Sequence, residues 1–130
     1  MKLDYAHLAL SVRDMEKSIA FYTKVFGFTK AFSLKDEDGN PWIEYVKVAP
    51  GKFIELFYGN DKENAGSFNH ICFTVDDVQE MTRRIEAAGE KVTIGPKIGV
   101  DGNWQVWTVD PDGNKIEIMQ YAENAPQLQY

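Results

Sequence analysis

The sequence contains two copies of one pattern, and this duplication is the feature that most constrains its fold. Residues 5–12 (YAHLALSV) match residues 68–75 (FNHICFTV), which places His7 against His70 at an offset of 63 residues. Two Asp-Gly-Asn turn segments, at 38–40 and at 101–103, keep the same offset. A tryptophan follows each of them closely. Because the offset exceeds the unit typical of solenoids and propellers, we interpret the pattern as a duplicated half-domain.

A third match lies near the end of each copy. Residues 51–56 (GKFIEL) match residues 113–118 (GNKIEI), so that Glu55 meets Glu117 at an offset of 62 residues. One inserted or deleted residue explains the difference between the two offsets. The matches therefore cover most of each copy and favour one architecture repeated twice.

Each copy is expected to contain a strand, a helix and three further strands. Residues 5–12 alternate between apolar and other side chains, which is the signal of a strand with one apolar face. The expected later elements are a helix at 15–26 and strands at 30–34, 42–48 and 52–58, with a second helix between Asp77 and Gly89 and strands at 92–94, 105–109 and 115–121. The predicted fold class is α+β, with two tandem βαβββ modules whose helix-free faces form a shared cleft.

Turn and capping residues give the helices definite ends. Asp14 is the expected N-cap of the first helix and Gly27 its stop, while Asp77 with Glu80 forms a capping box for the second. The expected buried stripes are Met15, Ile19, Tyr22 and Phe26 in the first helix, and Val78, Met81 and Ile85 in the second.

The length of 130 residues predicts a single domain, 1–130, containing a first module at 1–60 and a second at 67–121. The polar residues 59–67 are the expected joint between the modules. Residues 122–130 contain proline and little pattern, so we expect a loosely held tail.

Charge and hydropathy argue against several classes of partner. A net charge of −6 offers little attraction to nucleic acid or to an anionic membrane surface. The chain has no run of about 18 apolar residues and no signal peptide pattern, so we expect a cytoplasmic protein. The single cysteine, Cys72, has no second thiol to pair with and is expected to be a small buried hydrophobic residue.

Two histidines and two glutamates occupy matched positions and are the candidate metal ligands: His7, Glu55, His70 and Glu117. Strand alternation points all four away from the faces that the helices cover. A carboxylate in a partly desolvated place is costly to leave unpaired, and a cation removes that cost. Two imidazoles and two carboxylates without a thiolate suit one divalent ion, with zinc, nickel, cobalt, manganese and ferrous iron all qualifying.

Each candidate also has an ordinary structural interpretation. A strand histidine is commonly a hydrogen-bonded structural residue, and a strand glutamate commonly joins a cross-strand or rim salt bridge. The match between the two copies favours a ligand role, because the chain has only two histidines and they fall at duplicate positions. Matched residues kept by descent after loss of the metal are the alternative.

Several segments together carry a family resemblance: the His7 strand, residues 18–22 (SIAFY), 25–28 (VFGF), 69–71 (NHI) and 109–117 (VDPDGNKIE). They resemble the vicinal oxygen chelate superfamily, which includes glyoxalase I (lactoylglutathione lyase), methylmalonyl-CoA epimerase, extradiol dioxygenases, fosfomycin-resistance proteins and bleomycin-binding proteins. The resemblance implies the glyoxalase/bleomycin resistance/dioxygenase fold, a small-molecule substrate and a homodimer, with the site either inside one chain or shared between two.

Glu55 stands at the position that separates the subfamilies. By resemblance, dioxygenases and fosfomycin-resistance proteins have no ligand on that strand, the epimerase has glutamine, and glyoxalase I has a carboxylate. The full set is similar to that of a bacterial-type glyoxalase I, and residues 95–99 (GPKIG) are similar to the loop that covers its site. Ser11 and Gly59 replace the arginine and asparagine of that enzyme, which leaves open whether glutathione is used.

We therefore expect a metal-dependent lyase or isomerase that transfers a proton on a substrate with vicinal oxygens, such as a hemithioacetal of methylglyoxal. By resemblance Glu117 is the first choice for carrying the proton and Glu55 the second, while the histidines stay neutral ligands. Other enzymes of the superfamily remain alternatives (an epimerase, an extradiol dioxygenase or a fosfomycin-type transferase), as does a metal-free protein that binds a drug or metabolite. Four aromatic residues are expected to line the cleft or to pack in the core: Trp42, Tyr45, Trp104 and Trp107.

Overall fold

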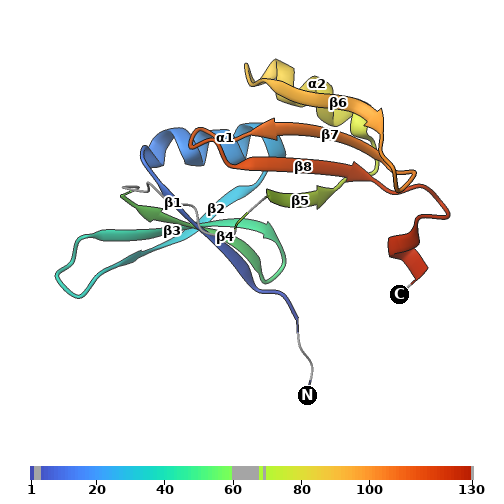
Figure 1. Cartoon of the computed structure of the whole chain (residues 1–130). Coiled ribbons are helices and arrows are strands. Elements are labelled where there is room, and N and C mark those ends of the chain that lie inside the picture. The colour runs from blue at the N-terminus through green and yellow to red at the C-terminus, as the bar shows by residue number, and fades with distance from the viewer. Residues whose placement is uncertain (2–3, 60–67, 69, 130) are drawn as a thin grey trace. The chain divides into compact units, whose positions relative to one another are not determined.

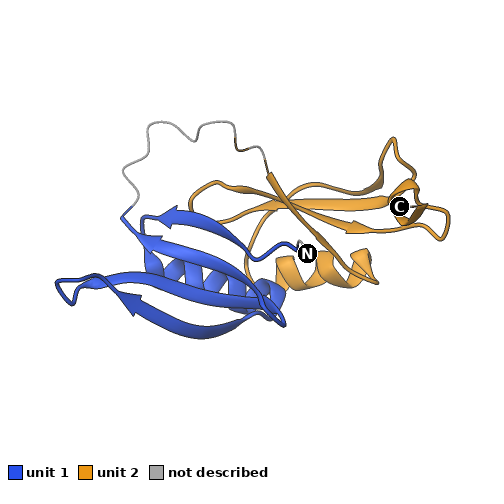
Figure 2. Cartoon of the chain, turned by 90° about the horizontal axis from the view of Figure 1, so that it is seen from below, with its two compact units in different colours: residues 1–65 blue, residues 66–130 orange. Residues whose placement is uncertain are grey.

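The structure of the chain is a computed structural model that describes residues 1, 4–59, 68 and 70–129. It divides into two compact units, Met1–Ala65 and Gly66–Tyr130, which Figure 2 shows in blue and orange. The boundary falls inside the predicted joint at 59–67, of which only Gly59 lies within the described residues. The single domain over 1–130 and the shared cleft stay predictions.

The first unit is a four-stranded mixed sheet with one helix over one of its faces (Figure 1). The strand order is β1-β4-β3-β2, where β1 runs parallel to β4 and the other neighbours are antiparallel. Its elements are β1 (His7–Val12), α1 (Met15–Phe26), β2 (Thr29–Lys35), β3 (Pro41–Ala49) and β4 (Lys52–Tyr58).

The second unit repeats this topology with the strand order β5-β8-β7-β6. Again the first and last strands of the unit are parallel and the other neighbours are antiparallel. Its elements are β5 (His70–Thr74), α2 (Val78–Ala87), β6 (Val92–Ile98), β7 (Trp104–Val109), β8 (Lys115–Gln120) and a terminal 3-10 helix, η1 (Pro126–Gln129). The predicted pair of βαβββ modules is confirmed. Within the described ranges, no helix is long and apolar enough to span a bilayer.

Strand alternation gives each sheet a buried face and a free face. In the first unit Ile54 and Leu56 are buried together with Val46, and in the second unit Ile116 and Ile118 are fully buried. These residues lie on the faces that the helices cover. The intervening positions of β4 and β8 carry the two glutamates, which therefore belong to the free faces as predicted.

Helix α1 begins and ends as predicted, but its buried face is rotated. The Asp14 side chain accepts a hydrogen bond from the Lys17 N–H at 3.1 Å, and Gly27 ends the helix at a φ of 71°. The buried residues are Met15, Ser18, Phe21, Tyr22 and Val25, whereas Ile19 and Phe26 of the predicted stripe are half-buried. Apolar side chains occupy a wide arc of this helix, so two neighbouring stripes were available, and the small Ser18 allows close approach to the sheet.

Helix α2 follows its prediction closely. The Asp77 side chain accepts from the Glu80 N–H at 2.9 Å, and Gly89 follows the helix at a φ of 79°. The Glu80 carboxylate accepts from the Arg83 guanidinium at 2.8 Å. The predicted stripe of Val78, Met81 and Ile85 is buried, together with Thr82.

Strand β6 is longer than predicted, because it continues through a segment that was expected to be a loop. Residues 95–98, which resemble a covering loop, belong to β6. Pro96 lies inside a register shift between Ile94 and Lys97, where the strand ladder requires no N–H donor from it. A break in the ladder therefore accommodates the proline without ending the strand.

The C-terminal segment is held in place rather than loose. Its Ala125 is buried, and the Ala122 N–H donates to Asn103 Oδ1 at 2.9 Å. The Gln127 amide accepts from Asn103 Nδ2 and donates to Asp101 Oδ2, both at 3.0 Å. The expectation of a loosely held tail was wrong, because polar side chains at the turn before β7 bind this segment.

Candidate metal centre

The first unit brings His7 and Glu55 together on the free face of its sheet. The parallel register of β1 and β4 sets His7 beside Phe53 and Ala9 beside Glu55. The small Ala9 side chain leaves room for the two groups, and His7 Nδ1 lies 3.5 Å from Glu55 Oε1. Glu55 is only 7% exposed, whereas His7 is exposed. The pair thus combines a nearly buried carboxylate with an accessible imidazole.

The second unit builds the matching pair from His70 and Glu117. His70 Nε2 lies 3.1 Å from Glu117 Oε2 across β5 and β8. The Glu117 side chain keeps 12% of its surface exposed, and the His70 side chain keeps more. Cys72 is paired with Glu117 in the register, at the position that Ala9 holds in the first unit. Each unit therefore brings one histidine and one glutamate of the predicted four together.

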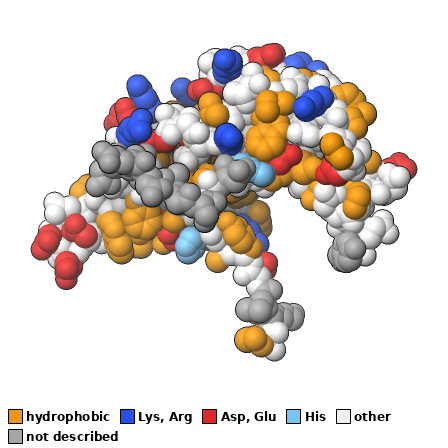
Figure 3. All heavy atoms as spheres, in the orientation of Figure 1, with side chains coloured by type: hydrophobic (Ala, Val, Ile, Leu, Met, Phe, Trp, Pro, Cys, Tyr) orange, Lys and Arg blue, Asp and Glu red, His pale blue; other side chains and the backbone are white. Residues whose placement is uncertain are grey.

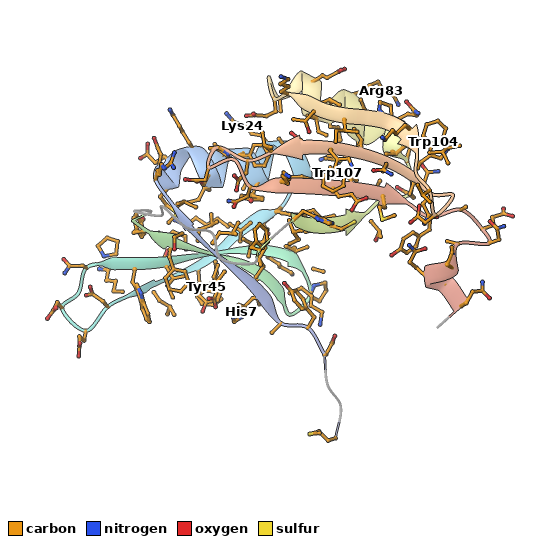
Figure 4. All side chains as sticks on the ribbon, in the orientation of Figure 1. His7, Lys24, Tyr45, Arg83, Trp104 and Trp107 are labelled. Atoms are coloured by element: carbon orange, nitrogen blue, oxygen red, sulfur yellow. The ribbon has the colours of Figure 1, made fainter. Side chains whose placement is uncertain are left out.

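Tyr45 adds a hydrogen-bond donor to the first pair. It lies opposite Glu55 in the β3–β4 ladder, and Figure 4 shows Tyr45 and His7 on the side of the sheet away from α1. The Tyr45 hydroxyl donates to the Glu55 carboxylate, and this bond, with smaller effects of burial and of the glutamate charge, raises the pKa of Tyr45. A neutral hydroxyl therefore holds one carboxylate oxygen in place.

Trp107 takes the matched position in the second unit but makes a different contact. Its ring centroid lies 4.8 Å from that of His70 with the planes at 60°, so the indole limits how the imidazole can turn. The indole N–H donates to Gln105 Oε1 at 2.6 Å. The two pairs are thus equivalent in their His and Glu residues and different in their supporting residues.

Cys72 was expected to be buried, and this was wrong. It is exposed on the free face, because the strand alternation that directs His70 also directs the residue two positions later. Partial burial of the thiol, with the negative charge and a hydrogen bond of Glu117, raises the pKa of Cys72 to about 12. The thiol therefore stays protonated near neutral pH and donates to Glu117.

The two pairs fit the coordination of a small divalent cation. Two ligands that each lie about 2.0–2.2 Å from one ion, at angles between 90° and 109°, are separated by roughly 2.9–3.5 Å. The His–Glu separations of 3.5 Å and 3.1 Å fall in this range. Within the described residues no group of three or more His, Cys, Asp or Glu is placed to hold a metal. Convergence of both pairs on one ion stays a prediction.

The four aromatic residues named from the sequence all avoid the buried core. Trp42 and Trp104 are exposed, and Tyr45 and Trp107 are half-buried. Trp42 makes an edge contact with Phe57, with ring centroids 5.9 Å apart. The interpretation that these residues pack in the core is therefore wrong. Their exposure is compatible with a role at the surface or in the candidate site.

Sequence reasoning missed a buried carboxylate, Glu44 of β3. Burial raises its pKa, but hydrogen bonds from Ser33, Tyr58 and Lys30 outweigh that effect and lower the pKa of Glu44. The Tyr58 hydroxyl lies 3.1 Å from Glu44 Oε1, and Lys30 Nζ lies 3.3 Å from Oε2. Comparison of the two copies could have pointed to Glu44. Its matched residue in the second copy is the apolar and fully buried Val106, so a charged residue at this position is unexpected.

An open hollow lies at the ends of the two strands that carry His70 and Glu117. Its lining residues are Thr74, Val75, Asp76, Gln120 and Tyr121. Thr74 and Tyr121 each follow a candidate ligand by four residues, at the positions matched to Ser11 and Gly59 in the first copy. Because the Gln120 side chain accepts a hydrogen bond from the Val78 N–H at the start of α2, the hollow lies at the strand ends and includes residues from both faces of the sheet.

Comparisons with known proteins agree with this architecture. The family model described as Glyoxalase/Bleomycin resistance protein/Dioxygenase superfamily matches residues 4–118. The lactoylglutathione lyase of Escherichia coli O157:H7 is 35% identical, over 88% of this chain and 90% of its own length. A probable trivalent organoarsenical cleaving enzyme of Bacillus subtilis (strain 168) is 30% identical, over 95% of this chain and 84% of its length.

A solved structure shares the fold across nearly the whole chain. The fosfomycin resistance protein from Listeria monocytogenes, complexed with Mn(II) and sulfate, superposes with a TM-score of 0.75 at 22% identity. The match covers 98% of this chain and 99% of that one. Sequence, topology and relatives lead to one conclusion: the chain belongs to the glyoxalase/bleomycin resistance/dioxygenase superfamily, the vicinal oxygen chelate family.

Proposed function

We propose that this protein is a metal-dependent lyase or isomerase of the glyoxalase I type, which transfers a proton on a small substrate with vicinal oxygens. The observation that carries the proposal is the matched occurrence of a His–Glu pair on the free face of each sheet, at 3.5 Å and 3.1 Å. Both glutamates are largely buried, and a cation would compensate the cost of that burial.

One divalent ion would be held by the two pairs, brought together within a chain or across a homodimer: His7, Glu55, His70 and Glu117. Two carboxylates balance the double charge, and neutral imidazoles are the form of histidine that binds metals. When bound, the ion supplies a Lewis acid that polarises the two adjacent oxygens of the substrate. The donor set admits zinc, nickel, cobalt, manganese and ferrous iron.

The different neighbours of the two glutamates support Glu117 as the proton carrier. Tyr45 donates a hydroxyl hydrogen bond to Glu55, which favours a fixed position for that carboxylate. At the matched position Trp107 directs its N–H to Gln105, so Glu117 lacks the counterpart of the Tyr45 hydroxyl; besides its partner His70, the Cys72 thiol, a weak donor, reaches it. Glu117 is therefore the freer of the two to collect a proton from carbon and return it to the neighbouring carbon.

The relatives support one substrate class for this proposal. A lactoylglutathione lyase at 35% identity supports a hemithioacetal of methylglyoxal. Ser11 and Gly59 replace the arginine and asparagine expected by resemblance for the glutathione carrier. The assay must therefore compare several thiols.

The test uses protein stripped of metal and reloaded with each of the five ions in turn. Hemithioacetals of methylglyoxal with glutathione and with two smaller thiols are followed for conversion to the thioester. We expect turnover that requires metal, falls by about 10²–10⁴-fold in Glu117→Gln, and persists in Glu44→Gln as the matched control. Absence of turnover with every thiol and metal, or oxygen uptake with a catechol by the ferrous form, would overturn the proposal.

A further inference from the structure

We infer that the substrate carries a flat aromatic group next to its vicinal oxygens, bound against three rings of the first unit: Phe32, Tyr45 and Phe53. This inference rests on the proposed function and names the substrate class of the same site. It assigns substrate recognition to the three rings, of which only Tyr45 also supports the candidate metal site, through its hydroxyl.

The three rings form one contiguous apolar surface, the ring cluster. Phe32 stacks on Tyr45 with centroids 4.1 Å apart and planes at 17°. Phe53 meets both rings edge-on, at 6.0 Å from Phe32 and 5.8 Å from Tyr45. Despite these contacts Phe32 keeps 46% of its surface exposed, which leaves apolar area for another ring to cover.

The ring cluster is continuous with the first His–Glu pair. Phe53 is the register partner of His7, and Tyr45 is the register partner of Glu55. The Tyr45 hydroxyl donates to Glu55 while its ring stacks on Phe32. Figure 3 shows that histidine side chains, in pale blue, reach the surface among hydrophobic side chains in orange. A group bound on the rings would therefore sit next to the candidate ligands.

The second unit shows that the fold does not require these rings. Ile94 pairs with Trp107 in its sheet just as Phe32 pairs with Tyr45, and Lys115 pairs with His70 just as Phe53 pairs with His7. The same sheet thus forms with an isoleucine and an exposed lysine at two of the three positions. Ligand recognition explains the rings better than folding does.

The size and setting of the ring cluster favour a small ligand over a second protein surface. Phe32 is 46% exposed and the other two rings are half-buried, so the three side chains offer at most roughly 300 Å² of contact area, below the roughly 500 Å² that each partner contributes to a specific protein interface. The cluster borders the nearly buried Glu55, and an ion with its bound substrate satisfies that carboxylate whereas an apolar protein partner does not.

The experiment compares two chelators that differ in one substituent. Benzohydroxamate and acetohydroxamate each offer two adjacent oxygens, with a phenyl or a methyl group beside them. Calorimetry measures their dissociation constants for zinc-loaded protein, without any turnover. We expect benzohydroxamate to bind about tenfold more tightly to the wild type, and the preference to fall to within about twofold in Phe32→Ala. The matched variant Ile94→Ala should keep the tenfold preference.

The outcomes separate the two proposals. If neither chelator binds the loaded protein, the proposed metal site fails and the inference fails with it. If both bind equally to the wild type, or if Phe32→Ala keeps the phenyl preference, the inference alone is overturned. Light scattering on the same samples covers the remaining case: if the wild type shows no phenyl preference and Phe32→Ala changes the molecular mass, the inference is overturned and the ring cluster is an interface between copies.

Discussion

Asn103 joins the C-terminal segment to the turn before β7, and its replacement by alanine has a cost that follows from its contacts. The residue is fully buried and its side chain makes three hydrogen bonds. Nδ2 donates to Asp101 Oδ2 and to Gln127 Oε1, both at 3.0 Å, and Oδ1 accepts from the Ala122 N–H at 2.9 Å. Because Ala122 lies just after β8, these bonds connect the strand of Glu117 with the strand of Trp107.

The expected loss in the free energy of unfolding is about 2–4 kcal/mol for Asn103→Ala. Each hydrogen bond contributes about 1 kcal/mol net, and the Ala122 N–H is left without its partner. The bond from Gln127 to Asp101 survives at 3.0 Å, which places the estimate nearer the lower value. Against a typical total stability of about 5–15 kcal/mol, this loss is large.

Urea unfolding followed by circular dichroism measures the change, and the first copy offers the control. Asn40 occupies the matched position, is exposed, and uses its backbone N–H to donate to Asp36 Oδ1 at 2.9 Å. Asn40→Ala should therefore change stability by less than about 0.5 kcal/mol. Equal effects of the two variants, or an Asn103→Ala protein as stable as the wild type, would refute the reasoning.

Three further predictions concern charge and the candidate site. Hydrogen bonds outweigh burial and lower the pKa of Glu44. The ionised carboxylate therefore stabilises the fold fully at pH values above its unfolded pKa of 4.5, and this contribution is lost as the pH falls through the lower pKa of the folded state. Glu44→Gln should flatten the acid-side pH dependence of the melting temperature, and an unchanged curve would contradict this. Tyr45→Phe removes the donor to Glu55 and should weaken zinc affinity about 10–100-fold in a chelator competition, against no change in Phe57→Leu. In metal-free protein the raised pKa of Cys72, about 12, predicts slow alkylation by iodoacetamide at pH 8 despite its exposure, and faster alkylation in Glu117→Gln.

The duplication made most of the fold predictable from the sequence. A strand or turn that is ambiguous in one copy is supported by its partner, and the order βαβββ emerges from both copies together. Helix α1 has the bounds expected from Asp14 and Gly27, because capping is a local interaction between neighbouring residues. The placement of the two histidines and two glutamates on the free faces was predictable for a similar reason, since strand alternation fixes which face each side chain takes.

The misses occurred where the two copies differ or where tertiary contacts decide. Residues 95–98 look like a loop by their glycine and proline, but the β6–β7 ladder tolerates Pro96 at a register shift. Residues 122–130 have no periodicity in the sequence, and the described part of this segment is bound by the distant Asp101 and Asn103. Glu44 sits where the second copy has a buried valine, and this difference marks the position but does not predict the three hydrogen-bond partners that stabilise its charge. Convergence of the two pairs depends on the arrangement of the units, which no local pattern determines.

The most direct test of the account is a metal titration of stripped protein by calorimetry, in the wild type and in one ligand variant from each unit. We expect one equivalent of zinc per chain in the wild type, with that same site weakened by at least about 100-fold in both His7→Ala and His70→Ala. Loss of binding in only one of the two variants, two independent sites, or no uptake by the wild type would contradict the claim that both His–Glu pairs serve one ion.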